Sequence, residues 1–197
     1  DEGGLLVELL RARGALPSYY LRYYYATREV VEEQRTSPIR AEEVMEIERG
    51  LLALYGDLTL DVKPALLEQR GGAFYSEAAA QLIASLHAGT ADVQVVDVRN
   101  DGALPDLARG AVVEIPARID RDGAHPFALA PLAPEMRGLV DHALAYEELT
   151  VAAAISGDRR IALRALLANP LVPDFATARD LLDAMLEANR AHLPRFH

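Results

Sequence analysis

Apolar residues recur every three to four positions over most of the chain, which is the spacing of helices with one buried face. Glycine, proline and asparagine mark the ends of these periodic stretches. The helices predicted on this basis cover 5–13, 18–34, 40–55, Tyr75 to near Gly89, 135–155, the stretch around 161–167 and the residues after Thr177, with a short helical turn after Pro64. Helical structure is therefore expected to dominate the fold.

Residues with branched β-carbons concentrate in one part of the chain, where the pattern favours strands instead of helices. The predicted strands are 93–98, 112–119 and a short third one near 126–129, which follows a hairpin turn at 120–123. Prolines at 131 and 134 then stop strand pairing. No internal linker is long enough to divide the chain. The predicted fold class is α+β, a single helix-rich domain over 1–197 with a small antiparallel sheet.

Composition and charge exclude several classes of function. The 197 residues carry a net charge of −10 and include no cysteine. An acidic chain lacks the basic face that nucleic acids or anionic membranes require, so neither is an expected partner. Without cysteine there is no disulfide, thiolate ligand or thiol nucleophile, which fits a cytoplasmic protein. No apolar run reaches the length of a transmembrane helix.

The usual catalytic signatures are also missing from this sequence. The five histidines are not spaced as metal ligands on a helix, and no Gly-x-Ser-x-Gly elbow occurs. No Gly-x-Gly-x-x-Gly follows a strand, so this segment is not expected to bind a dinucleotide by itself. From the residues alone, the prediction goes no further than an acidic α+β domain.

Two short stretches nevertheless suggest a site. In RGGAFYSEAA, residues 70–79, adjacent glycines form a turn before an alanine-rich helix, which places Tyr75 at the start of that helix. The unbonded N–H groups and the dipole of a helix start favour negative charge there. The alternative is a simple turn with Tyr75 packed into the core. In the turn at 99–102, Asn and Gly can supply left-handed dihedral angles.

The chain resembles the 6-phospho-β-glucosidases of glycoside hydrolase family 4 over nearly its whole length. The matching stretches are RGGAFYSEAA, GALPSYYLRYYY (14–25), VRNDGALPDL (98–107), AVVEIPARI (111–119), EELTVAAAISGDRRIALRALLANPLVP (147–173) and ARDLLDAMLEANRAHLP (178–194). The resemblance covers only the C-terminal half of such enzymes, so the N-terminal NAD-binding domain is absent from this sequence. It implies a fold similar to the C-terminal domains of lactate and malate dehydrogenases.

The resemblance also implies an activity and a mechanism. Such enzymes cleave phosphorylated disaccharides with NAD and a divalent metal, usually manganese, by redox-assisted elimination. The matching position makes Tyr75 the base that removes the C2 proton, and makes Arg70, Arg99 and Asn100 candidate substrate contacts. A purely structural Asn-Asp-Gly turn remains the alternative for Asn100. The metal ligands and the dinucleotide site would lie in the missing half, so no cofactor is expected to bind this fragment, which should be inactive alone.

Three other interpretations remain open. Another family 4 specificity, for α-glycosides or unphosphorylated sugars, would use the same chain. A stand-alone interaction or dimerisation domain would explain the tyrosine stripe within 18–34, which is expected to be a subunit contact or a wall of the active site. The third interpretation is that the chain is the substrate-binding half of a hydroxy-acid dehydrogenase. It lacks support, because the sequence shows no arginine–histidine arrangement like the one those enzymes use. Exposed apolar faces that would meet the missing half predict a homo-oligomer.

Overall fold

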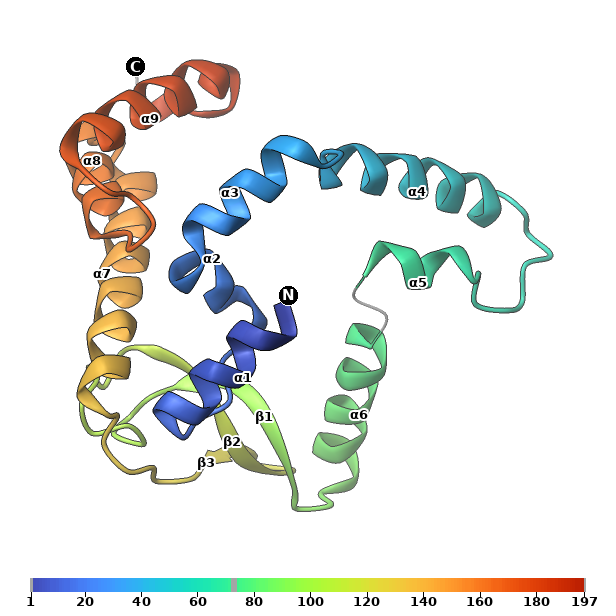
Figure 1. The fold of residues 1–197 in the computed structure, drawn as a ribbon. Helices are drawn as coiled ribbons and strands as arrows, with labels where there is room; N and C mark the ends of the chain where they lie inside the picture. Colours follow the sequence, from blue (N-terminus) through green and yellow to red (C-terminus); the bar gives the residue numbers. More distant parts are fainter. Residues whose placement is uncertain (1, 72–73, 197) are drawn as a thin grey trace. The chain divides into compact units, whose positions relative to one another are not determined.

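The computed structural model of the protein describes residues 2–71 and 74–196. It is helix-rich with one small antiparallel sheet, as predicted (Figure 1). By internal contacts the chain forms two compact units, one of 1–92 with 119–123 and one of 93–118 with 124–197. Within the described residues, no helix is both long enough and apolar enough to cross a bilayer.

The first unit is mainly helical and also includes the turn at 119–123, which joins two of the strands. Its helices are α1 (Glu2–Arg13), the 3-10 turn η1 (Tyr19–Leu21), α2 (Arg22–Tyr25), α3 (Thr27–Thr36), α4 (Arg40–Tyr55), α5 (Leu66–Arg70) and α6 (Tyr75–Ala88). Gly14 has a φ of 67° where α1 ends, a conformation that glycine adopts without strain. Helix α4 has the predicted bounds, and α5 is the helical turn expected after Pro64.

The single helix predicted over 18–34 is wrong, because the chain breaks at Ala26. The backbone of Ala26 has φ −128° and ψ 37°, which ends α2 before α3 begins. The Thr27 hydroxyl donates to the carbonyl oxygens of Tyr23, at 2.7 Å, and Tyr24, at 3.1 Å. A side chain that bonds these carbonyls competes with the helical ladder. The apolar periodicity continues through the break, which is why the sequence pattern did not reveal it.

The sheet has the order β1–β2–β3, with β1 at Asp92–Arg99, β2 at Val112–Asp120 and β3 at Gly123–Pro126. Buried and exposed residues alternate along β2, so one face of the strand meets the core. The third strand starts earlier than the predicted 126–129. The Asp120 carboxylate accepts the Asp122 N–H at 2.9 Å, which closes a two-residue turn and lets the strand start at Gly123.

Three long helices form the rest of the second unit: α7 (Pro134–Ser156), α8 (Arg159–Ala168) and α9 (Phe175–Ala188), followed by the 3-10 turns η2 (Arg190–His192) and η3 (Pro194–Phe196). Helix α9 starts before the predicted Thr177, because the Asp174 carboxylate accepts the Thr177 N–H at 2.8 Å and caps the helix. Leu166, Ala178 and Leu182 form a buried cluster between α8 and α9.

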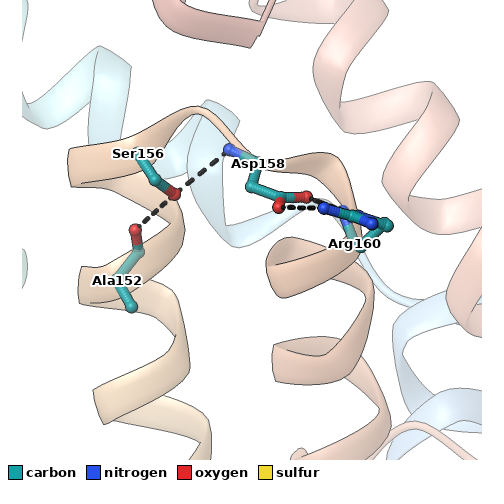
Figure 2. A network of polar contacts seen from close by, with 4 residues as sticks. All are labelled: Ala152, Ser156, Asp158 and Arg160. Atoms are coloured by element: carbon teal, nitrogen blue, oxygen red, sulfur yellow. Dashed lines mark hydrogen bonds and ion pairs between the residues drawn. The ribbon is translucent and has the colours of Figure 1, made fainter.

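A tight junction joins α7 to α8 (Figure 2). Gly157 is left-handed, with a φ of 70°, and its N–H donates to the Ala153 carbonyl at 2.8 Å. The Ser156 hydroxyl donates to the Ala152 carbonyl at 2.7 Å and accepts the Asp158 N–H at 3.2 Å. Asp158 then caps α8 by accepting the Arg160 N–H at 2.7 Å.

Replacing Gly157 by Ala is expected to destabilise the second unit by at least about 1–2 kcal/mol, the cost of a left-handed non-glycine residue. The added Cβ would also lie 1.9 Å from the carbonyl oxygen of Arg195, so the C-terminal segment must move. Urea unfolding followed by far-UV circular dichroism measures the change. Gly138→Ala is the control, since its Cβ meets open space in α7 and should stabilise by up to about 1 kcal/mol. Equal stabilities of the two variants would contradict the prediction.

Acid should weaken the cap of α8. The hydrogen bond from the Arg160 side chain, followed by the Arg160 N–H, lowers the pKa of Asp158 below its usual value. Because the folded pKa is the lower one, the charged cap stabilises the protein above the unfolded pKa of about 3.9 and is lost as pH falls through the folded value. We expect the melting temperature of Asp158→Asn to lie below that of the wild type at pH 7. This difference in melting temperature should disappear in acid. In an Arg160→Gln background, the difference in melting temperature between the protein with Asp158 and its Asp158→Asn variant should be smaller at pH 7. A difference that does not change with pH would show that the charge of the Asp158 cap is not its cause.

Candidate functional site

Tyr75 is the first residue of α6, so its predicted position at a helix N-terminus is confirmed. Its side chain is 78% exposed and projects from the helix start without a hydrogen bond to another described residue. The first N–H groups of a helix have no partners within the helix, and the dipole there favours a negative charge. Because its side chain is exposed, the hydroxyl of Tyr75 is accessible to a substrate.

The turn before α6 is only partly described. Gly71 has a φ of 85°, the conformation expected of a glycine turn. Gly72, the second glycine of that turn, lies outside the described residues. Phe74, which precedes the helix, is 76% exposed beside Tyr75. Sequence reasoning missed this residue, since an apolar side chain before a helix usually packs back onto it.

Arg70 is the last residue of α5 and belongs to the same unit as Tyr75. Its guanidinium lies 3.8 Å from the Glu48 carboxylate, with both side chains about half exposed. Such an exposed pair contributes at most about 1 kcal/mol, so a charged substrate group can replace the Glu48 carboxylate. Arg40 donates to the Gln69 carbonyl at 2.8 Å and so ties α5 to α4.

Arg99 ends β1 and belongs to the second unit. Its side chain is exposed, lies 3.1 Å from the Asp101 carboxylate and donates to the Arg109 carbonyl at 3.4 Å. Asp101, with a φ of 44°, and Gly102, with a φ of 105°, are the left-handed residues of the turn. Asn100 itself is not left-handed, and its N–H donates to the carbonyl of Ala111, just before β2, at 2.8 Å.

Asn100 is almost completely buried, with 1% of its surface exposed. Its amide nitrogen donates to the carbonyls of Leu104, at 2.9 Å, Leu107, at 3.1 Å, and Ala108, at 3.2 Å. Its amide oxygen accepts the Leu104 N–H at 2.7 Å. These contacts favour the structural alternative that the sequence left open. Asn100 organises the loop after β1, and Arg99 is the exposed residue of the pair.

The four predicted site residues thus form two pairs. Arg70 and Tyr75 flank a short connection in the first unit, and Arg99 and Asn100 are neighbours in the second. Over residues 2–71 and 74–196, no group of three or more histidine, aspartate or glutamate side chains could hold a metal ion. We therefore assign no metal ligand within these residues.

A family model described as the family 4 glycosyl hydrolase C-terminal domain matches residues 3–172. A probable 6-phospho-beta-glucosidase of Bacillus subtilis is 39% identical over 193 residues, which cover 96% of this chain and 44% of that protein. A maltose-6'-phosphate glucosidase of Fusobacterium mortiferum is 30% identical over 183 residues, covering 91% and 41%.

The fold is similar to a solved structure as well. The 6-phospho-beta glucosidase of Thermotoga maritima with manganese, NAD+ and glucose-6-phosphate superposes with a TM-score of 0.87 at 31% identity. The superposition covers 98% of this chain and 48% of that one. The chain therefore spans less than half the length of the relatives that it matches.

Proposed function

The chain belongs to glycoside hydrolase family 4, and on this basis we propose that it is the C-terminal catalytic domain of a 6-phospho-β-glucosidase. The observation that carries the proposal is the exposed Tyr75 at the start of α6. A chain without cysteine fits the reducing cytoplasm as its compartment.

In the proposed reaction Tyr75 acts as the base that removes the proton from C2 of the sugar. Its place at the start of α6 and its exposed ring let the hydroxyl reach a bound substrate. NAD and a divalent metal, both present in the Thermotoga structure, would make the C2 proton acidic. Among the described residues no three side chains could hold a metal, and the sequence has no dinucleotide fingerprint, so we propose that residues outside this chain hold both.

Arg70 and Arg99 are proposed to bind oxygen atoms of the phosphorylated substrate. Each has a guanidinium that is half exposed or more and is engaged only in surface contacts. Guanidinium groups suit phosphate because they donate two parallel hydrogen bonds. Asn100 would contribute indirectly, by fixing the loop that begins beside Arg99.

A second proposal concerns assembly. Tyr19, Tyr20, Tyr23 and Tyr24 are all exposed, and the rings of Tyr20 and Tyr23 stack at 6.4 Å. Exposed aromatic clusters are typical of interfaces. We propose that this segment is a homo-oligomer contact or a wall of the active site. Light scattering of the chain at high concentration tests the first of these, and a strict monomer would rule it out.

The activity is tested on the longest polypeptide that carries this sequence, with NAD and manganese present. We expect release of nitrophenol from 4-nitrophenyl β-glucoside 6-phosphate, and little from the α-anomer or the unphosphorylated β-glucoside. The Fusobacterium relative acts on a maltose phosphate by its name, so preference for the α-anomer is the alternative outcome. Activity on neither phosphorylated anomer would refute the proposal.

The 197-residue chain alone is the matched control for that assay. It should release no nitrophenol and should not bind NAD in calorimetry, because its sequence has no dinucleotide fingerprint. Saturable NAD binding near a micromolar dissociation constant, about −8 kcal/mol, would contradict this expectation.

A further inference from the structure

A cavity of about 400 Å³ lies within the second unit and is lined by residues of α7, α8, α9 and the C-terminal turns that follow them. Its floor includes Ala153, Ala165 and Leu182, which are all buried. Phe196 and Leu193 close it from the C-terminal segment. The size falls within the range of about 300–1,000 Å³ that small-molecule sites occupy.

The wall of the cavity is mostly apolar, and two of its polar side chains are bonded to nearby carbonyls. The Thr150 hydroxyl donates to the Tyr146 carbonyl at 2.7 Å, and the Asn189 amide donates to the Met185 carbonyl at 2.8 Å. Each bond stays within one helix or its end, leaving methyl, methylene and ring surfaces towards the cavity. A cavity lined in this way offers water few hydrogen-bond partners and therefore favours an apolar ligand.

Arg195 brings a permanent positive charge to this wall. One guanidinium nitrogen donates to the Ile155 carbonyl at 2.6 Å. Among the described residues the Arg195 guanidinium meets no carboxylate, and no aspartate or glutamate lines the cavity. In the adjoining pocket, by contrast, Glu187 is paired with Arg190 at 2.7 Å. Within the part of the chain that the structure describes, Arg195 therefore places a positive charge without a carboxylate partner at the exposed edge of an apolar space.

We propose that this cavity binds a small organic monocarboxylate whose apolar body, about the size of a phenyl ring with a short chain, enters between the helices. The carboxylate would meet the remaining N–H groups of Arg195, which suit it in geometry and charge. The lining favours an apolar carboxylate over two other classes of ligand. A neutral apolar molecule would fill the cavity but leave Arg195 without a partner, and a small anion would pair with Arg195 but leave the cavity unfilled. The site is independent of Tyr75 and of the proposed glycosidase activity.

The test uses the ¹⁵N-labelled chain and three probes: 4-phenylbutyrate, 4-phenyl-1-butanol and butyrate. Amide shifts at Ala153, Ala165 and Leu182 should saturate with phenylbutyrate, respond more weakly to the alcohol and not respond to butyrate. Arg195→Gln keeps a donor for the Ile155 carbonyl but removes the charge, and should weaken phenylbutyrate binding about tenfold while leaving the alcohol unchanged. Arg190→Gln, which lies outside the cavity, is the matched control and should change neither.

Ala165→Leu fills the cavity from α8 and should abolish binding of both phenyl probes. Circular dichroism verifies its fold, and Arg195→Gln keeps the proposal testable if that variant unfolds. No saturable shifts at millimolar probe, shifts at other residues, or equal loss in the two arginine variants would overturn the proposal. Shifts of the same amides with protein concentration alone would show that a second copy fills the cavity, and would also overturn it.

Discussion

Replacing Tyr75 by Phe is expected to lower turnover by roughly two to four orders of magnitude, the usual contribution of a general base. The change keeps the ring and removes only the ionisable oxygen. Tyr75 is 78% exposed and bonds to no other described residue, so stability should hardly change. The protein to assay is the longest polypeptide that carries this sequence, with NAD and manganese present.

The decisive measurement is exchange of the C2 hydrogen of the substrate with deuterated solvent. Exchange should fall in parallel with turnover, because both need the same proton transfer. Tyr55→Phe is the matched control: it makes the same change on an exposed residue at the end of α4 and should leave both rates unaltered. Normal exchange in the Tyr75 variant would show that Tyr75 is not the base.

The position of Tyr75 could be predicted because its signals are local. Adjacent glycines and the alanine run that follows define a helix start without reference to the rest of the fold. The bounds of α4 were predictable for the same reason, since one amphipathic stretch ends at Gly56. Local patterns determine such elements whenever tertiary contacts agree with them.

Other features depend on contacts that periodicity does not contain. The break at Ala26 comes with a hydroxyl that bonds two carbonyls of the preceding turn, while the apolar pattern continues across it. Asn100 looks like an ordinary turn residue in the sequence. Its burial follows from a loop that folds back over its amide, between residues four and eight positions later. The cavity beside Arg195 involves segments forty residues apart and has no sequence signal.

The loop around Asn100 offers the largest expected change in stability. Asn100→Asp keeps the size of the side chain but replaces the amide nitrogen by a carboxylate oxygen. Three carbonyl oxygens, of Leu104, Leu107 and Ala108, then lose their donor and face a negative charge. The neighbouring Leu104 and Leu107 belong to a buried apolar cluster with little solvent to compensate. An unpaired buried charge typically costs about 3–5 kcal/mol, and we expect a loss of this size at pH 7.

Urea unfolding of the Asn100→Asp variant between pH 7 and pH 3 measures this loss and identifies its cause. The folded state favours the protonated carboxyl, which regains one O–H donor, so the deficit relative to the wild type should be largest at neutral pH and shrink in acid. Asn169→Asp is the matched control, because Asn169 uses its side-chain oxygen to accept the Leu171 N–H at 2.9 Å, and a carboxylate can do the same. That variant should change stability by no more than about 1 kcal/mol. Similar deficits for the two variants would mean that the buried amide of Asn100 does not hold the loop that follows Arg99.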